Sequence, residues 1–166
     1  MNNLKYIVQS ELQMEQLGSR VSHALLGACA NSIIIYLKGN LGAGKTTLTR
    51  GFLRGLGYQE TVKSPTFTLV EPYDFEEYTV YHFDFYRLNS PLELEGMGIA
   101  DYFGLSTYCL IEWPQKGEGV CPAPDIEIKI DTHIDSHEND SQRTVEFIAH
   151  NELSVLTLAV LKKLEN

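Results

Sequence analysis

The sequence predicts an α/β fold built around a phosphate-binding loop, and three observations predict it. Residues 39–46 read Gly-Asn-Leu-Gly-Ala-Gly-Lys-Thr and match the pattern G-x-x-x-x-G-K-[ST] at every defined position. The apolar run 32–37 before this loop indicates a buried strand, and residues 47–53 after it begin a helix. Two later apolar strands each end on an acid, Asp84 and Glu112. In open α/β sheets, ligands bind beyond the carboxyl ends of the strands, so these acids are candidate site residues.

The first helix and the strand before it are indicated by cap and periodicity signals. Residues 4–8 are expected to form an edge strand, and Ser10 with Gln13 resembles a capping box that opens a helix through about residue 26. The apolar residues of this helix recur at helical spacing: Leu12, Leu17, Val21, Ala24 and Leu25. The helix after the phosphate loop is expected to end near Gly55–Gly57, where two glycines interrupt the pattern.

The rest of the chain is expected to be richer in strands. Short apolar or alternating runs indicate five of them: residues 66–72, 78–83, 107–111, 125–130 and 143–149. The last two are expected to pair antiparallel, joined by a polar and mobile segment, residues 131–142. A turn is expected at residues 76–77, and a short helix from Ser90, which is followed by proline. Asn151 is expected to cap a final helix that runs to about residue 164.

Composition limits the class of protein. A chain of 166 residues is long enough for a core, and we expect a single domain over residues 1–166. No apolar run approaches the ~20 residues of a membrane span, and the N-terminus has no secretory pattern. The cysteines, Cys29, Cys109 and Cys121, form no C-x-x-C pair. They argue against a zinc site and favour reduced thiols in the cytoplasm.

The net charge of −9 is unevenly distributed along the chain. Residues 1–70 hold seven Lys/Arg and three Asp/Glu, whereas residues 71–166 hold six and nineteen. A free-standing nucleic-acid binder usually shows a basic face, and none is evident in this sequence. We therefore expect no strong direct binding of nucleic acid. The acidic part, residues 71–166, has two interpretations: a solubilising surface or a docking face for a basic partner.

The phosphate loop has a defined chemistry. Its backbone N–H groups and the dipole of the following helix favour an anion. Lys45 is placed to reach the β- and γ-phosphates of a nucleotide, and the Thr46 hydroxyl is placed to reach Mg²⁺. Magnesium needs a further oxygen ligand. We expect either Asp84 or Glu112 near the metal, directly or through water, and the other to polarise the attacking water; the sequence leaves open which does which.

Neighbouring residues offer further candidates with alternative interpretations. Residues 63–68 form either a loop that senses the γ-phosphate or a capped turn into a strand. His82 alternates with aromatic residues along a strand, which favours a structural histidine over a catalytic base. Arg87 is expected to pair with Asp84 or, less readily, to reach a phosphate. Trp113 follows Glu112 directly and is expected near the site.

Other nucleotide-dependent classes fit less well. A GTPase needs the guanine-reading motif N-K-x-D, which this sequence lacks. A small-molecule or nucleoside kinase of the phosphate-loop class is the stronger alternative, because such kinases have a similar size. They usually carry an arginine-rich lid, but the cations after Leu88 are few and scattered: Lys116, Lys129, Arg143, Lys162 and Lys163.

Four blocks resemble one family, the bacterial TsaE (YjeE) proteins, small ATPases required for threonylcarbamoyladenosine formation in tRNA. The blocks are residues 39–47, 62–71, 81–88 and 110–114. The phosphate loop alone would be generic, but S-P-T-F-T-L-V followed by H-F-D-F-Y-R-L is specific. Length and order also resemble the family until about Ile130.

The resemblance implies a P-loop NTPase fold with a central, mostly parallel sheet, flanking antiparallel strands and helices on both faces. It implies Mg²⁺-dependent ATP hydrolysis acting on a TsaB–TsaD complex, with tRNA bound through those partners. It places Thr46 and Glu112 at Mg²⁺, Asp84 at metal or water, and Thr66 in a switch-like loop. Lys45 and its neighbours would contact ATP, together with Glu11 at the start of the first helix. The implied ATP contacts in the loop are Leu41, Gly42, Ala43, Gly44, Lys45, Thr46 and Thr47.

Overall fold

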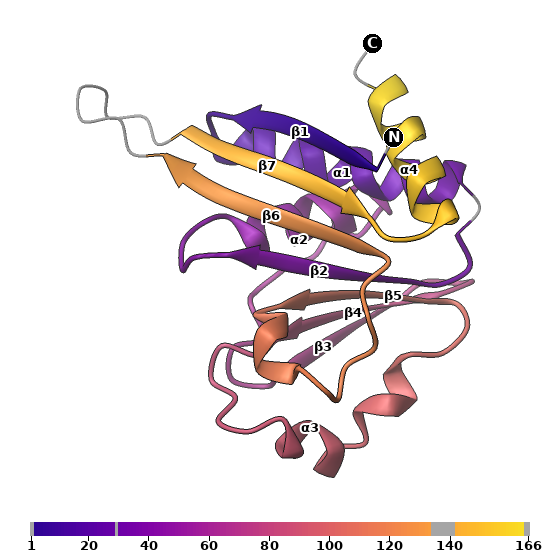
Figure 1. The fold of residues 1–166 in the computed structure, drawn as a ribbon. Helices are drawn as coiled ribbons and strands as arrows, with labels where there is room; N and C mark the ends of the chain where they lie inside the picture. Colours follow the sequence, from indigo (N-terminus) through magenta and orange to yellow (C-terminus); the bar gives the residue numbers. More distant parts are fainter. Residues whose placement is uncertain (1, 29, 134–141, 165–166) are drawn as a thin grey trace.

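The computed structural model, which describes residues 2–28, 30–133 and 142–164, contains one seven-stranded sheet (Figure 1). The strands are β1 (Asn3–Val8), β2 (Ile33–Gly39), β3 (Val70–Asp74), β4 (Thr79–Asp84), β5 (Thr107–Glu112), β6 (Ile126–His133) and β7 (Gln142–Ala149). Their order across the sheet is β1-β7-β6-β2-β5-β4-β3. The central pairs, β6–β2, β2–β5 and β5–β4, are parallel, and the outer pairs are antiparallel. The predicted parallel centre with flanking antiparallel strands is therefore confirmed.

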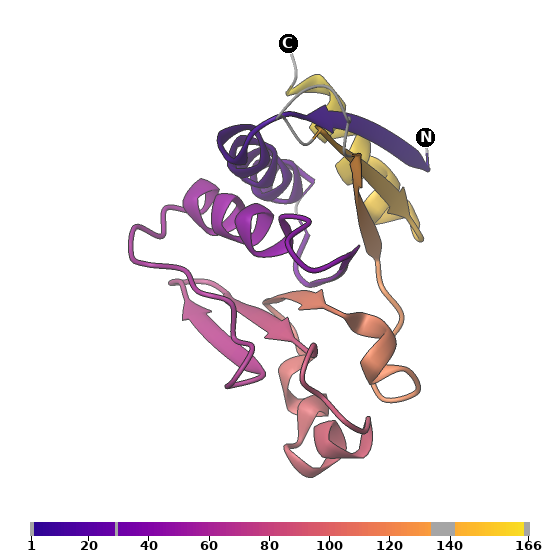
Figure 2. The ribbon, with the colours of Figure 1, turned by 90° about the vertical axis from the view of Figure 1, so that its left-hand side faces the viewer.

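Helices cover both faces of the sheet, as predicted (Figure 2). They are α1 (Glu11–Gly27), α2 (Lys45–Gly55), α3 (Leu92–Gly96) and α4 (Glu152–Lys163), with 3₁₀ turns η1 (Ile99–Tyr102) and η2 (Pro114–Gly117). Helices α1, α2 and α4 share the larger core with one sheet face. On the other face, α3 and η1 contribute to a smaller core against β4 and β5. None of the helices in the described ranges is long and apolar enough to cross a membrane.

The predicted helix caps are present in the structure. Ser10 accepts a hydrogen bond from the N–H of Gln13 at 3.2 Å, which satisfies a free donor in the first turn of α1. Asn151 caps α4 in the same way through the N–H of Ser154. Helix α3 differs slightly, because Pro91 occupies the cap position and Ser90 accepts from the N–H of Leu92 at 3.3 Å.

Helices α1 and α2 pack backbone against backbone at two glycines. A Cβ atom on Gly51 would lie 2.0 Å from the carbonyl oxygen of Glu15, and one on Gly18 would lie 2.1 Å from the carbonyl oxygen of Leu48. Only a residue without a side chain allows such an approach. The contact fixes α2, which starts at Lys45, against α1, which starts at Glu11.

One predicted strand starts in the wrong place. The sequence predicts a strand over residues 66–72, but β3 begins only at Val70, and Thr66–Thr68 form a turn. The N–H of Leu69 closes this turn on the carbonyl of Pro65 at 2.8 Å, and Leu69 has a φ of 66°. The alternating pattern was misleading because the hydroxyl of Thr66 binds a carboxylate instead of lining a sheet face.

The other predicted elements agree with the structure to within a few residues. Strand β1 lies at the sheet edge as expected, and β6 and β7 pair antiparallel as expected. Strand β6 continues through residues 131–133, which the sequence assigned to the connecting segment. The remainder of that predicted mobile connection, residues 134–141, lies outside the described residues.

Candidate functional site

The phosphate loop joins the end of β2 to the start of α2 through glycines in unusual backbone conformations. Gly44, the residue before α2, has a φ of 111°, which a residue with a side chain rarely adopts. A Cβ atom on Gly39 would lie 2.7 Å from the carbonyl oxygen of Ile130 in the neighbouring strand. These positions require glycine, so the spacing of the motif follows from the turn it must make. The N–H of Ala43 donates to the carbonyl of Asn40 within the loop at 3.1 Å.

Lys45 lies folded back over the loop. Its ammonium donates to the carbonyls of Gly39 and Asn40 at 2.8 and 3.0 Å and lies 4.4 Å from the ring centre of Trp113. Only 5% of the residue is exposed. Burial lowers the pKa of Lys45 below the usual lysine range, and the nearby carboxylates of Glu112 and Asp84 oppose that shift. The loop therefore carries its positive charge inside the site.

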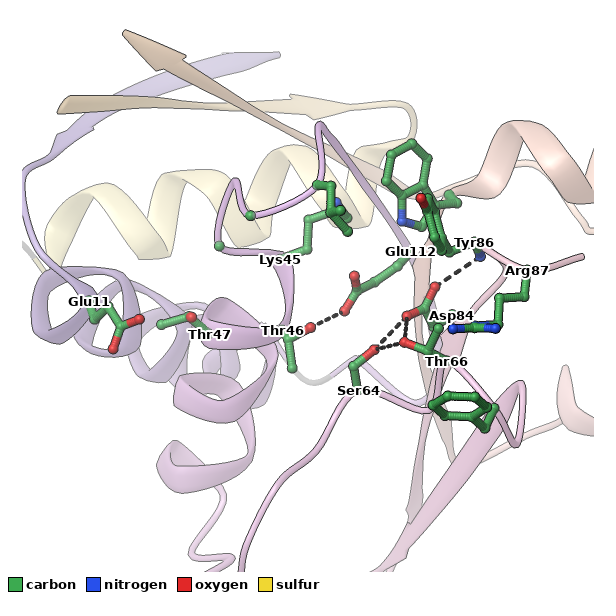
Figure 3. A pocket seen from close by; sticks show the side chains of 15 residues that line it. Glu11, Lys45, Thr46, Thr47, Ser64, Thr66, Asp84, Tyr86, Arg87 and Glu112 are labelled. Carbon is green, nitrogen blue, oxygen red and sulfur yellow. Dashed lines mark hydrogen bonds between the residues drawn. The ribbon is translucent and has the colours of Figure 1, made fainter. Parts of the chain in front are cut away.

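Glu112, the last residue of β5, connects the loop to the sheet. Its Oε1 accepts a hydrogen bond from the Thr46 hydroxyl at 2.8 Å and lies 2.9 Å from Nε2 of His82 (Figure 3 shows the Thr46 contact). His82 is fully buried on β4. The imidazole thus orients the Glu112 carboxylate from within the core, in keeping with a structural histidine.

Asp84, the last residue of β4, lies directly across from Glu112 in the parallel register of β4 and β5. Its Oδ2 accepts hydrogen bonds from the hydroxyls of Ser64 and Thr66, the latter at 2.8 Å. Its Oδ1 accepts the N–H of Tyr86 at 2.9 Å (Figure 3). Because the carboxylate is only 3% exposed, these three donors replace the water it has lost.

These residues line one cavity of about 510 Å³, which we call the site cavity (Figure 3). Nearly all the site residues predicted from the sequence line this cavity: Glu11, Leu41, Gly42, Gly44, Lys45, Thr46, Thr47, Thr66, Asp84 and Glu112. Ala43 is the exception, because its side chain is buried in the larger core. The structure therefore brings together residues from α1, the phosphate loop, the turn before β3, and the ends of β4 and β5.

Five further residues, which were weaker candidates on sequence grounds, also line the site cavity. They are Ser64, Phe67, Tyr86, Arg87 and Trp113. The closely spaced hydroxyls of Ser64 and Thr66 were a usable signal, since both donate to one carboxylate. The expected pairing of Arg87 with Asp84 is absent among the described residues; the guanidinium carbon lies instead 4.3 Å from the ring centre of Phe67. Its position depends on an aromatic contact that the sequence did not indicate.

The oxygen ligands in the site cavity fit a hard cation. Magnesium in nucleotide sites is usually held by one or two carboxylates together with phosphate oxygens and water. The Thr46 hydroxyl and the Glu112 carboxylate are already 2.8 Å apart, and Asp84 lies on the adjacent strand. Within the described ranges no group of three His, Cys, Asp or Glu side chains forms a cage for a metal ion. The hydroxyl of Thr46 and the carboxylate of Glu112 suit a cation that also takes phosphate oxygens and water as ligands.

Comparisons with known proteins agree on one family. The family model "Threonylcarbamoyl adenosine biosynthesis protein TsaE" matches residues 8–145. The "tRNA threonylcarbamoyladenosine biosynthesis protein TsaE" of Haemophilus influenzae is 47% identical over 154 residues, covering 92% of this chain and 94% of that protein. The protein of the same description from Bacillus subtilis is 38% identical over 116 residues, covering 70% of this chain and 69% of that protein. A crystal structure of Bacillus subtilis YdiB superposes with a TM-score of 0.77 at 28% identity, covering 99% of this chain and 97% of YdiB.

Proposed function

We propose that this chain, which belongs to the TsaE family, is a magnesium-dependent ATPase of the cytoplasm that acts in forming threonylcarbamoyladenosine in tRNA. Its immediate partner would be the TsaB–TsaD complex, which would hold the tRNA. The position modified would be the adenosine next to the anticodon. This proposal joins the chemistry of the site cavity to the process named in the descriptions of the relatives.

The observation that carries the ATPase part is the contact between Thr46 and Glu112 at the mouth of the phosphate loop. A hydroxyl at the start of the helix after the loop and an acid at the end of a neighbouring strand are the two protein ligands that P-loop enzymes offer to Mg²⁺. Bound there, the ion would neutralise charge on the β- and γ-phosphates. The loop N–H groups and Lys45 would hold the same phosphates.

The remaining residues would serve the hydrolytic step. Asp84 lies across from Glu112 and would orient the attacking water or the hydration shell of the metal. Thr66 would belong to a turn that responds to the γ-phosphate, because its hydroxyl already binds Asp84. Glu11, at the far end of the site cavity, would approach the nucleotide from α1 (Figure 3).

Measurement of phosphate release tests the proposal. With ATP and Mg²⁺, we expect the isolated protein to release phosphate slowly and the protein with TsaB–TsaD to release it faster. Partner proteins of P-loop enzymes commonly supply a charge that stabilises the transition state or help to orient the attacking water. Equal rates with and without the partner complex would argue against that partnership. Replacing Thr46 with Val removes one proposed metal ligand at constant shape and should abolish magnesium-dependent release.

The same reaction mixture separates an ATPase from the alternative, a small-molecule or nucleoside kinase. A kinase would transfer the phosphoryl group to an added nucleoside or sugar, whereas an ATPase releases inorganic phosphate. Chromatography with radiolabelled ATP distinguishes the two products. Appearance of a phosphorylated acceptor would overturn the ATPase assignment.

The excess of acidic residues supports an indirect role at tRNA. Residues 71–166 hold nineteen acids and six Lys/Arg, so long-range repulsion opposes a polyanion. We expect isolated protein to bind tRNA weakly in filter-binding assays at physiological salt. A sub-micromolar dissociation constant would show that the chain itself grips tRNA.

A further inference from the structure

Arg87 is held by its neighbours in a fixed position at the edge of the site cavity. The N–H of Tyr86 donates to Asp84, and the N–H of Leu88 donates to the carbonyl of Phe85 at 3.0 Å. The ammonium of Lys116 donates to the carbonyls of Tyr86 and Leu88, on either side of Arg87. The backbone at Arg87 is therefore tied down from both sides, which is how a functional side chain is kept in place.

The side chain of Arg87 is supported without being neutralised. Its guanidinium carbon lies 4.3 Å from the ring centre of Phe67, an aromatic residue that is itself 83% exposed. Within the described part of the chain, no carboxylate pairs with the guanidinium and no acceptor takes a hydrogen bond from it. A contact with an aromatic face occupies the face of a guanidinium and leaves its N–H edge free for other acceptors.

Arg87 and Lys45 are the only cationic side chains among the residues that line the site cavity in the described chain. Figure 3 shows them on opposite sides of Asp84 and Glu112. Lys45 belongs to the loop that would bind the β- and γ-phosphates, so a second cation across the carboxylates would face the end of the phosphate chain. A planar fork of N–H donors matches phosphate oxygens better than any other side chain.

We propose that Arg87 is a catalytic residue of the proposed ATPase, contacting the γ-phosphate and stabilising the charge that develops on it during hydrolysis. The inference rests on the proposed function and adds to it an arginine supplied by the chain itself. Phe67 is its positioning residue: the ring would hold the guanidinium over the site cavity before the nucleotide arrives. This assigns a role to an aromatic side chain that is exposed at the edge of the site cavity.

The test compares nucleotides that differ only in the γ-phosphate. Dissociation constants for Mg–ADP and for a non-hydrolysable Mg–ATP analogue are measured with wild type, Arg87→Ala and Arg87→Lys, together with single-turnover hydrolysis of ATP. We expect Arg87→Ala to leave ADP affinity within about 2-fold, to weaken analogue binding about 10-fold, and to slow hydrolysis about 100-fold. Arg87→Lys should give values between those of wild type and Arg87→Ala, since lysine keeps the positive charge but lacks the planar set of N–H donors of the guanidinium.

Arg20 provides a matched control, because its guanidinium carbon also lies over an aromatic ring, 5.2 Å from the centre of Tyr6, but Arg20 does not line the site cavity. Arg20→Ala should behave as wild type in all three measurements. Phe67→Leu should slow hydrolysis by less than Arg87→Ala. The double variant should be no slower than Arg87→Ala alone, because the ring acts through the guanidinium.

The outcomes separate this inference from the proposed function. If wild type binds and hydrolyses ATP and Arg87→Ala does so equally well, the role of Arg87 is refuted while the ATPase proposal stands. Equal weakening of ADP and analogue binding would also refute it, since the contact would then not be with the γ-phosphate. If wild type binds neither nucleotide, the proposed function fails, and the role of Arg87 fails with it.

Discussion

The two walls of the site cavity are held in place by different kinds of contact. The phosphate-loop wall is fixed by backbone, through the conformation of Gly44 and the close packing of α2 on α1 at Gly51. The opposite wall, the turn at residues 64–69, is joined to the sheet by one backbone hydrogen bond, from the N–H of Asp84 to the carbonyl of Leu69 at 3.0 Å, and by side chains. The hydroxyls of Ser64 and Thr66 both donate to the Asp84 carboxylate. The first wall is therefore held mainly by backbone, whereas the second depends in part on what the Asp84 carboxylate binds.

This difference suggests how the site would respond to its ligand. Because its own backbone conformation holds the phosphate loop, we expect that loop to rearrange little when a nucleotide binds. A metal-bound water that donates to the Asp84 carboxylate would compete with the two hydroxyls and loosen the second wall. The turn at residues 64–69 is thus the natural place for a ligand-dependent movement.

The largest expected effect comes from the first wall. Lys45→Ala removes the ammonium that would meet the β- and γ-phosphates, and we expect ATP affinity to fall about 100- to 1,000-fold, since a buried charged contact is lost. The fold should persist, because Lys45 lies over the site cavity and donates to loop carbonyls. Isothermal titration calorimetry measures the affinity, and unchanged binding would contradict the placement of Lys45.

A smaller effect is expected from the packing that fixes the same wall. Gly51→Ala would place a methyl group 2.0 Å from the carbonyl oxygen of Glu15, so α1 and α2 must move apart. We expect a loss of about 1–3 kcal/mol in the free energy of unfolding, the usual cost of overpacking. Urea denaturation measures it.

Gly96→Ala is the matched control for that substitution. Gly96 ends α3, and a Cβ atom there would meet nothing within 4 Å. We expect a change of no more than about 0.5 kcal/mol, as for other surface positions. If the two variants lost the same stability, the close approach of the helices could not be the cause.

The smallest expected effect concerns the second wall. Thr66→Val removes one donor to the Asp84 carboxylate at nearly constant shape. We expect the free energy of unfolding to fall by about 1–2 kcal/mol. Thr68→Val, on the same turn, changes an exposed residue that does not line the site cavity. It should lower the free energy of unfolding by less than Thr66→Val does. Melting temperatures of the two variants compare them directly. Equal losses would indicate that Asp84 does not hold the turn.

The same contrast explains what the sequence could predict. The phosphate-loop wall was predictable because its glycines, lysine and threonine match a known motif at fixed spacing, and local backbone geometry enforces the glycine positions. Asp84 and Glu112 were predictable because each ends an apolar strand, although only the sheet register brings them side by side.

The second wall was less predictable because long-range contacts determine it. Thr66 alternates with its neighbours as in a strand, yet its partner is Asp84, eighteen residues later. Arg87 has a nearby acid that favours an ion pair on sequence grounds, but the fold places an aromatic ring beneath it. Neither partner can be chosen without the tertiary structure.

The position of Trp113 makes its intrinsic fluorescence a probe of ligand binding in the site cavity. It is the only tryptophan in the chain, and its ring centre lies 4.4 Å from the Lys45 ammonium and 5.1 Å from the ring centre of Tyr86. A ligand that draws the ammonium away changes the electric field at the indole, so emission should shift on binding without any attached dye. The kinetics of filling the site cavity can therefore be followed by stopped-flow fluorescence in the unmodified protein.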